Sequence, residues 1–141
     1  MSKEKEKKWS KNRHILKSIN NPTQESYEVK IKIPEFTFEG DKNKPDFASL
    51  FLTFYPSEKV IELKSLKEYI YAFRSQLYSY ERIINVIYDD LVYVYDPARL
   101  RLVLVTNPRG GISSRLTVDS DWSVRGGKEI FNDWTVQKDE W

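Results

Sequence analysis

The sequence predicts an α+β domain in which two helices cover one face of a four-stranded antiparallel sheet. Two stretches with apolar residues at every second position come first, two stretches with helical spacing follow, and two alternating stretches come last. The predicted order is therefore strand, strand, helix, helix, strand, strand. The outer strands of such a sheet keep unpaired edges, which favours pairing with another subunit and a ring-forming homo-oligomer.

The first two strands are predicted in the N-terminal half of the chain. Residues 27–33 alternate apolar and charged side chains, which indicates a strand with one buried face. A loop is expected over residues 38–45, because the glycine, aspartate and asparagine there are typical of turns. Residues 47–55 are rich in Phe, Leu and Thr and predict the second strand, which Pro56 ends.

Two amphipathic helices are predicted in the middle of the chain. The first has apolar residues at intervals of four, three and four, from Leu66 to Leu77. Ser79 is a suitable N-cap for the second helix, although Arg82 rather than Glu stands at the capping-box position. The Asp-Pro pair at 96–97 ends this helix. Its apolar stripe consists of Ile83, Ile84, Ile87, Leu91 and Val94.

The second pair of strands follows the helices. Residues 100–104 alternate leucine with other side chains and predict one strand, residues 107–111 predict a turn, and residues 112–118 predict the last strand. From residue 119 onward the pattern dissolves, with a double glycine and three tryptophans whose expected role is packing.

The composition excludes several classes of protein. The 141 residues amount to one domain, and 40% of them are hydrophobic, which is enough for a core. The chain has no cysteine and His14 is its single histidine, so disulfides, thiolate chemistry and zinc sites of histidine and cysteine are excluded. Asp89 and Asp90 are interpreted as surface residues, because no further ligand is spaced to join them. We therefore expect no metal.

The sequence contains no sign of a membrane segment. No apolar run approaches the ~20 residues that a membrane helix needs. The basic N-terminus lacks the apolar stretch of a secretory signal. We therefore expect a cytoplasmic protein with no membrane contact.

Positive charge is concentrated at the N-terminus. Residues 1–17 carry seven basic and two acidic residues, whereas the remainder carries 16 basic and 19 acidic ones. The charge of the body therefore does not favour a nucleic-acid-binding surface. The leader is interpreted as a solvated tail, with tRNA contact as the alternative. We expect residues 1–25 to be a flexible basic leader and linker, 26–121 the folded domain, and 122–141 a C-terminal extension.

Several short motifs then indicate a family. They are Pro-Glu-Phe-Thr at 34–37, Pro-Asp-Phe-Ala at 45–48, Glu-Leu-Lys-Ser-Leu-Lys at 62–67, Glu81, and Pro-Arg-Gly-Gly-Ile at 108–112. In order and in nearly all spacing they resemble the NADPH-dependent 7-cyano-7-deazaguanine reductases, the nitrile reductases of queuosine biosynthesis, in their short single-module form. The resemblance covers residues 33–113, which is the whole predicted core, and the motif at 62–67 is its most specific part.

The resemblance implies the tunnelling fold. In that fold ββααββ subunits join their sheets into a multimeric barrel, such as stacked pentamers, with active sites at the subunit interfaces. The implied ligands are a 7-deazaguanine-type base and NADPH, and the implied pathway is tRNA modification. The interfacial sites agree with the free strand edges predicted above.

The resemblance also implies roles for single residues. Glu81 matches the carboxylate that binds the amidine edge of the deazaguanine, since a carboxylate accepts two parallel N–H bonds. Asp46 matches the acid that delivers protons to the reacting nitrile. The remaining matches line the base, at Tyr80, Ile61, Glu62 and Leu63, or hold the NADPH phosphates, at Lys64, Lys67 and Arg109.

Two positions near the chemistry depart from the family. The family nucleophile is a cysteine between the equivalents of Thr37 and Pro45, where this chain has no cysteine and is one residue shorter. Tyr80 stands where the family has a histidine before its substrate glutamate. The cysteine matters because thiolate addition converts a poorly reactive nitrile into a thioimide that NADPH can reduce.

Each candidate also has an ordinary structural interpretation. Asp46 follows a proline, as turn aspartates often do. Glu81 lies in the first turn of a helix, where its charge favours the helix dipole. Lys64 and Lys67 are one turn apart and suit a solvated helix face. Arg109 precedes two glycines that suit a hairpin turn.

Three functions follow from these observations. The first is an enzyme that acts on a 7-deazaguanine-type base without covalent catalysis. The second is a binding module that keeps the base pocket but has no turnover. The third is a relative that acts on the modified base within tRNA, which only the basic leader favours. A structural ring protein without a ligand is the remaining alternative.

Overall fold

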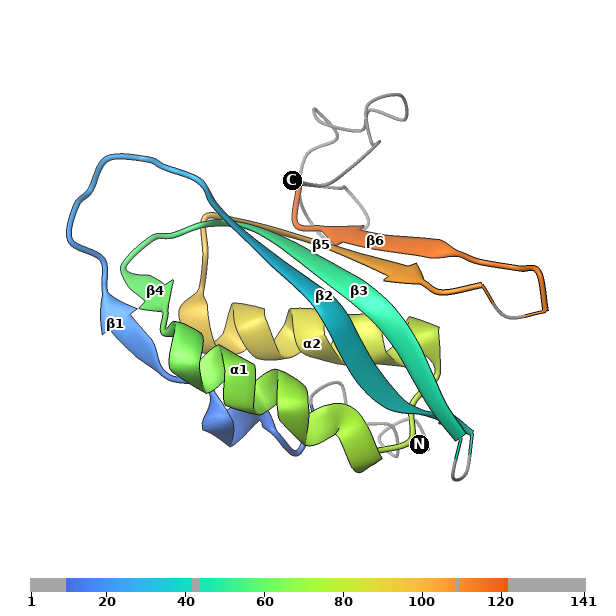
Figure 1. Cartoon of the computed structure of the whole chain (residues 1–141). Coiled ribbons are helices and arrows are strands. Elements are labelled where there is room, and N and C mark those ends of the chain that lie inside the picture. Colours follow the sequence, from blue (N-terminus) through green and yellow to red (C-terminus); the bar gives the residue numbers. More distant parts are fainter. Residues whose placement is uncertain (1–9, 42–43, 109, 122–141) are drawn as a thin grey trace, which may run out of the picture.

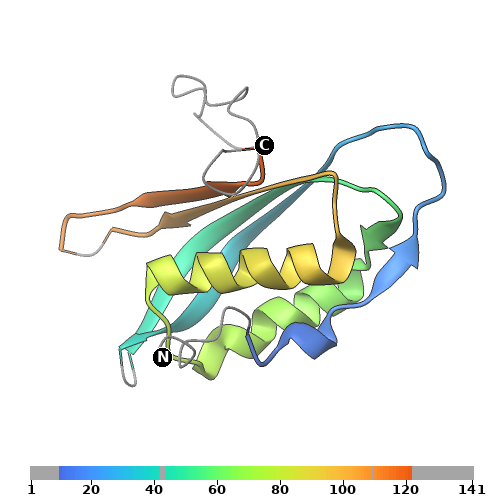
Figure 2. The ribbon, with the colours of Figure 1, turned by 180° about the vertical axis from the view of Figure 1, so that it is seen from behind.

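The sheet and the two helices of this computed structural model form two layers (Figure 1). The structure describes residues 10–41, 44–108 and 110–121. The four-stranded antiparallel sheet has the order β2-β3-β5-β6. Its strands are β2 Val29–Asp41, β3 Lys44–Tyr55, β5 Arg99–Thr106 and β6 Arg115–Asp119. Both helices, α1 Leu63–Tyr71 and α2 Tyr80–Tyr95, cover the same face of the sheet (Figures 1 and 2).

The predicted α+β class and the order of the six main elements are therefore confirmed. The sheet packs on the helices through alternate residues of its strands, because successive side chains of a strand point to opposite faces. In β5, Leu100, Leu102 and Leu104 are fully buried. The largest fully buried side chains are Tyr69, Tyr95, Phe36, Phe38, Phe54, Phe73, Leu50, Leu52, Ile83, Ile84, Ile87 and Leu91.

The helix ends are set by local hydrogen bonds. Ser79 is the N-cap of α2, as predicted, and its Oγ accepts a hydrogen bond from the backbone N of Arg82 at 3.1 Å. Glu62 caps α1, where its Oε1 accepts from the backbone N of Ser65 at 2.9 Å. Asp96 ends α2 in the left-handed conformation, with φ of 45°. The predicted end of α2 is thus confirmed.

The loop predicted over residues 38–45 is wrong. β2 and β3 remain paired as far as Asp41 and Lys44, so they form one long hairpin. Phe38 is fully buried and lies opposite Asp46 in the register, and this burial extends the strands through a stretch of turn-forming residues. The turn itself falls on residues 42–43, outside the described residues.

Two other boundaries differ from the predictions. Helix α1 ends at Tyr71 and is followed by the 3₁₀ turn η3, Ala72–Ser75. The helix is therefore shorter than the predicted one, which extended to Leu77. The last strand begins at Arg115 rather than at Ile112, which is 74% exposed. The turn before it contains Gly110 and Gly111, with φ of 61° and 84°, a conformation that glycine adopts without strain.

The N-terminal segment is folded against the helices from Ser10 onward. It contains the 3₁₀ turn η2, Arg13–Ile15, and then β1, Ser18–Asn20, which pairs with β4, Lys59–Ile61. The described part of the predicted flexible leader thus has defined contacts. Residues 1–9 and the C-terminal extension lie outside the described residues, so the leader's tRNA contact and the domain boundaries at 25 and 121 stay predictions.

The surface position predicted for Asp90 is also wrong. Asp90 is fully buried, and the N-terminal segment covers it. Its carboxylate accepts hydrogen bonds from the hydroxyls of Ser10 and Tyr69, both at 2.6 Å, and forms an ion pair with Arg13 at 2.8 Å. Burial and the neighbouring Asp90 charge raise the pKa of Tyr69 well above its usual value, so this hydroxyl stays protonated and donates.

Candidate functional site

Asp46 lies at the tip of the β2–β3 hairpin, on the helix-facing side of the sheet. It is directly opposite Phe38 in the strand register and is buried, with 5% of its surface exposed. Its carboxylate lies against the backbone of Gly40, where a Cβ would overlap Asp46 Oδ2. The carboxylate fits in this position because Gly40 has no side chain.

Tyr80 and Glu81 reach the same end of the molecule from the start of α2. The Tyr80 ring meets Phe38 edge-on, with ring centroids 5.7 Å apart. Glu81 is exposed in the first turn, and its carboxylate has no salt bridge to any of the described residues. Burial first, and the Glu81 charge second, raise the pKa of Tyr80. Tyr80 is therefore a phenol at neutral pH, able to donate a hydrogen bond.

The backbone fixes this cluster of Asp46, Tyr80 and Glu81, which we call the hairpin end. Glu39 N donates to Gln76 O at 2.9 Å, and Tyr78 N donates to Glu39 O at 2.9 Å. The connection between the helices thus runs beside β2, and Glu39 and Leu77 form a parallel bridge. This pairing leads the chain directly into the Ser79 cap and so sets where Glu81 emerges.

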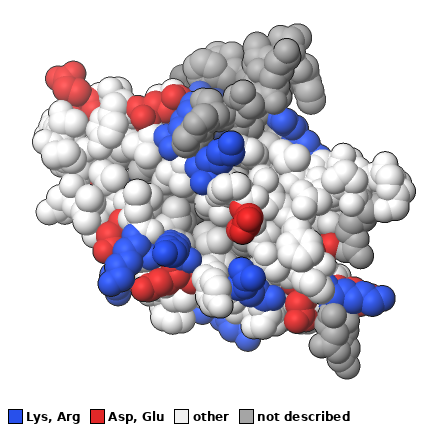
Figure 3. Space-filling model, viewed as in Figure 1, with Lys and Arg blue, Asp and Glu red and all other residues white. Residues whose placement is uncertain are grey.

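The other predicted residues lie where α1 begins, which we call the α1 start. Ile61 is buried at the end of β4 and Glu62 is the helix cap. Leu63 is 62% exposed, and Lys64 and Lys67 are exposed one turn apart on the helix. On the face seen in Figure 3, basic side chains gather over α1, with acidic ones among them.

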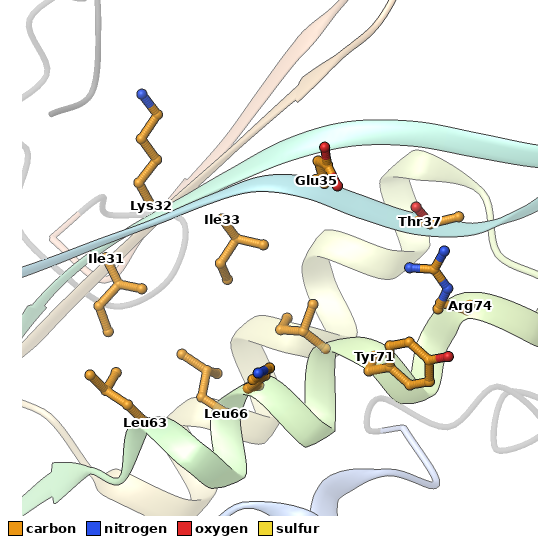
Figure 4. Close-up of a pocket in the computed structure, with 11 residues that line it drawn as sticks. Ile31, Lys32, Ile33, Glu35, Thr37, Leu63, Leu66, Tyr71 and Arg74 are labelled. Atoms are coloured by element: carbon orange, nitrogen blue, oxygen red, sulfur yellow. The ribbon is translucent and has the colours of Figure 1, made fainter.

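A groove of about 320 Å³ runs between α1 and the edge strand β2 (Figure 4). Its floor is apolar, whereas Lys67 and Arg74 give it positive charge. The Arg74 guanidinium lies 5.0 Å from the ring centre of Tyr71, which is 67% exposed. The full lining is Ile31, Lys32, Ile33, Glu35, Thr37, Leu63, Leu66, Lys67, Ile70, Tyr71 and Arg74.

These residues fit a phosphorylated nucleotide such as NADPH. Exposed lysines and an arginine supply charge for phosphates, and an exposed aromatic ring supplies a stacking surface. Sequence reasoning named Lys67 but missed Tyr71 and Arg74. Their spacing of four and seven residues from Lys67 was a usable signal, because such residues share a helix face.

The structure separates the predicted site residues into two groups. The nine residues of α1 and the four of η3 lie between them, a length of about 20 Å at the usual rise per residue. Figure 1 shows α1 beginning at one end of the sheet and α2 beginning at the other. Arg109 lies outside the described residues. A single copy of the chain therefore does not bring the predicted residues into one site.

Neither a metal cluster nor a membrane helix is found in the described part of the chain. No group of three or more His, Cys, Asp or Glu side chains there is arranged to hold a metal ion. No helix among the described residues is long and apolar enough to span a bilayer.

The comparisons with known proteins agree with the sequence motifs. The family model described as QueF-like protein matches residues 45–125. The NADPH-dependent 7-cyano-7-deazaguanine reductase of Thioalkalivibrio sulfidiphilus is 40% identical over 112 residues, which are 76% of this chain and 87% of that protein. The reductase of the same name from Nitrosospira multiformis is 39% identical over 122 residues, which are 83% of this chain and 88% of that protein.

A solved structure shows the same fold. The archaeosine synthase QueF-Like in its apo form matches with a TM-score of 0.55 at 10% sequence identity, over 70% of this chain and 95% of that chain. The ββααββ order and the sheet order described above are thus those of the tunnelling fold. Sequence motifs, family model and relatives together lead to one conclusion: this chain, although it has no cysteine, belongs to the QueF-like protein family.

Proposed function

We propose that this protein binds a 7-deazaguanine-type base through Glu81 and reduces its nitrile with NADPH, without a covalent protein intermediate. The observation that carries the proposal is the hairpin end, where a buried carboxylate, a phenol and an exposed carboxylate lie at the same end of the molecule. The names of the relatives support the base and the cofactor.

Glu81 is suited to hold the base. An exposed carboxylate at a helix start accepts two parallel N–H bonds from a 2-aminopyrimidinone edge. Tyr80, protonated and adjacent, offers a donor to an oxygen or nitrogen of the same ring. Asp46 is buried opposite Phe38, on which Tyr80 packs, and would deliver the proton.

The reaction needs two hydrides and two protons. NADPH would supply one hydride per molecule, so two molecules would be used in succession, one in each round. Asp46 gives a proton to the nitrogen in each round, so that C≡N becomes CH=NH and then CH₂NH₂, and Asp46 is reprotonated from water between them. No residue of this chain forms a thioimide, since the chain has no cysteine.

We also propose that the site is completed by a second copy of the chain. The lengths of α1 and η3, about 20 Å together, separate the α1 start from the connection that leads to Glu81, so the base and the residues of the α1 start would meet between copies. Among the described residues β2 and β6 are the edge strands of the sheet, and edge strands favour such pairing. Lys64, Lys67 and Arg109, together with Tyr71 and Arg74, would then hold NADPH, while the segment Ile61–Leu63 lines the base.

The alternative is a protein that binds the base without turnover. It is favoured by the absence of cysteine from the chain, because no residue can then form the thioimide through which the family activates the nitrile. Both functions place the base on Glu81, so they differ only in the product.

Product analysis separates these functions. The purified protein is incubated with 7-cyano-7-deazaguanine and NADPH, and the products are resolved by mass. We expect the aminomethyl product, and Glu81→Ala should abolish both binding and product. Binding without product would establish the alternative, and no binding at all would overturn both. Analytical ultracentrifugation tests the assembly: a protein that is active as a monomer would contradict the shared site.

A further inference from the structure

The N-terminal segment, residues 10–17, lies on the side of the helices away from the sheet (Figure 2). It is fixed at both of its ends. At one end Ser10 and Arg13 bind the buried carboxylate of Asp90 in α2. At the other end the main chain of Lys17 accepts from Glu62 N at 3.2 Å and from the Tyr95 hydroxyl at 2.7 Å.

Asn12 lies between these two anchors and makes a different kind of contact. It is buried, with 4% of its surface exposed. Its Nδ2 donates to Gln76 Oε1 at 3.1 Å, and Gln76 Nε2 donates back to Asn12 Oδ1 at 3.0 Å. The two amides thus satisfy each other in a reciprocal pair of hydrogen bonds.

Gln76 connects this pair to the hairpin end. Its carbonyl accepts from Glu39 N at 2.9 Å, and two residues later Tyr78 N donates to Glu39 O at 2.9 Å. Glu39 is next to Gly40, against which the Asp46 carboxylate lies. On the other side, Gln76 is five residues before Glu81. The side chain of Gln76 therefore holds a connection whose backbone reaches both carboxylates of the site.

We propose that Asn12 and Gln76 are positioning residues for the base-binding site. Their amide pair fixes the connection between η3 and α2, and thereby the position of Glu81 relative to Asp46. The inference rests on the proposed function. It assigns to the N-terminal segment a role in ligand affinity, in addition to its role in packing.

The pair is separable from the folding of the segment. The anchors at Asp90 and Lys17 involve the backbone of Asn12, whose N donates to Ser10 Oγ at 3.1 Å, but not its side chain. Removing the Asn12 side chain therefore leaves the segment docked and frees only Gln76. Loss of two neutral hydrogen bonds at a positioning contact corresponds to an expected loss of about tenfold in base affinity.

The test compares the affinity for 7-cyano-7-deazaguanine of wild type, Asn12→Ala, Gln76→Ala and the exchange N12Q with Q76N. The exchange keeps the summed length of the two side chains and both kinds of amide group. We expect each alanine variant to bind about tenfold more weakly, the double alanine variant to bind no more weakly than either, and the exchange to recover most of the affinity. Unchanged affinity in the alanine variants would overturn the proposal.

Two controls separate positioning from a general loss of stability. Ser120→Ala removes the hydroxyl, directly after β6, that accepts from Leu100 N at 3.0 Å. It should lower stability by a similar amount without changing affinity. Lys11→Ala changes an exposed neighbour of Asn12 and should change neither. If Ser120→Ala weakens binding as much as Asn12→Ala does, stability explains the effect and the proposal fails.

Hydrogen exchange gives a readout that does not need the ligand. In Asn12→Ala the amides of Glu39 and Tyr78 should exchange at least several-fold faster, whereas that of Ile87 in the middle of α2 should not change. If wild type binds no base, the proposed function fails, and these amides still decide whether Asn12 fixes the connection. Unchanged exchange at Glu39 and Tyr78 would overturn the positioning role in either case.

Discussion

The hairpin end and the α1 start are built by different means. At the hairpin end, Asp46 is buried, Tyr80 packs on Phe38, and main-chain hydrogen bonds fix the entry into α2. At the α1 start, Leu63, Lys64 and Lys67 project into solvent. The first region is organised within one chain, whereas the second exposes lysines and apolar surface that a ligand or another copy of the chain can contact.

This difference indicates which end should carry the chemistry and which end should bind the cofactor. Groups fixed by packing keep a defined orientation, which proton transfer needs. Exposed lysines act mainly through their charge, which salt screens. Substitutions at the two ends should therefore differ in which ligand they affect and in how much stability they remove.

The largest expected effect is on base binding in Glu81→Gln. The substitution keeps the shape of the side chain but removes the charge that strengthens two hydrogen bonds, so base affinity should fall about 10- to 100-fold. Urea unfolding should change by less than about 0.5 kcal/mol, because Glu81 is exposed. Isothermal titration measures the affinity. Retained affinity would show that the hairpin end is not where the base binds.

The next effect is on stability in Gly40→Ala. The new methyl group overlaps Asp46 Oδ2, so the carboxylate must move or the hairpin must open. The expected loss is about 1–3 kcal/mol of unfolding free energy, measured by urea, with a parallel loss of turnover. Gly111→Ala is the control, since its Cβ meets open space and only its φ of 84° is unfavourable. A Gly40→Ala variant as stable and active as wild type would contradict the close contact.

A pH effect is expected at the sheet end that lies beyond the α1 start. Burial alone would raise the pKa of Asp119, but hydrogen bonds and charge from Arg99 and Arg101 outweigh it and lower that pKa. The unfolded chain then binds the proton more readily. Stability from this carboxylate is present above the ordinary aspartate pKa and is lost as pH falls through the lowered one.

Asp119→Asn tests this directly. It should lower stability at neutral pH by about 1–3 kcal/mol and flatten the fall in stability on acidification, as followed by urea unfolding between about pH 6 and pH 3. Asp121 is the half-buried second partner of Arg99, with Oδ2 3.2 Å from Arg99 Nε. Asp121→Asn should lower stability and flatten the pH profile less than Asp119→Asn does. An unchanged pH profile in Asp119→Asn would place the acid sensitivity elsewhere.

The smallest effect is expected for Lys67→Ala. The change should weaken NADPH binding about three- to tenfold, leave base binding unchanged, and alter stability by less than about 0.5 kcal/mol. The loss should shrink as salt is raised, because the contact is electrostatic. Lys59→Ala, an exposed lysine outside the groove, is the control. A larger effect on the base than on NADPH would reverse the assignment of the two ends.

Local pattern predicted most of the fold but not the contacts between distant segments. The period of two predicted the strands, and helical spacing with Ser79 predicted α2 and its cap. Asp90 was wrongly predicted to lie at the surface because the segment that covers it begins at Ser10, 80 residues away in the sequence. The loop over residues 38–45 was misplaced because burial of Phe38 outweighs the turn preference of its neighbours.

The residues of the candidate site were predicted from the family motifs rather than from the periodicity of apolar residues. The motifs named residues at both ends, but only the structure shows that about 20 Å of helix separates them within one chain. The contact between Gly40 and Asp46 depends on strand register, which a bulge shifts between Glu39 and Asp41. Nothing in the residues alone fixes that shift.

The shared space of position 40 and Asp46 has a consequence for evolution. Any side chain at position 40, a cysteine included, collides with the carboxylate as it now stands. Substitution at position 40 is therefore epistatic with position 46: a side chain there is accepted only after the carboxylate has turned away.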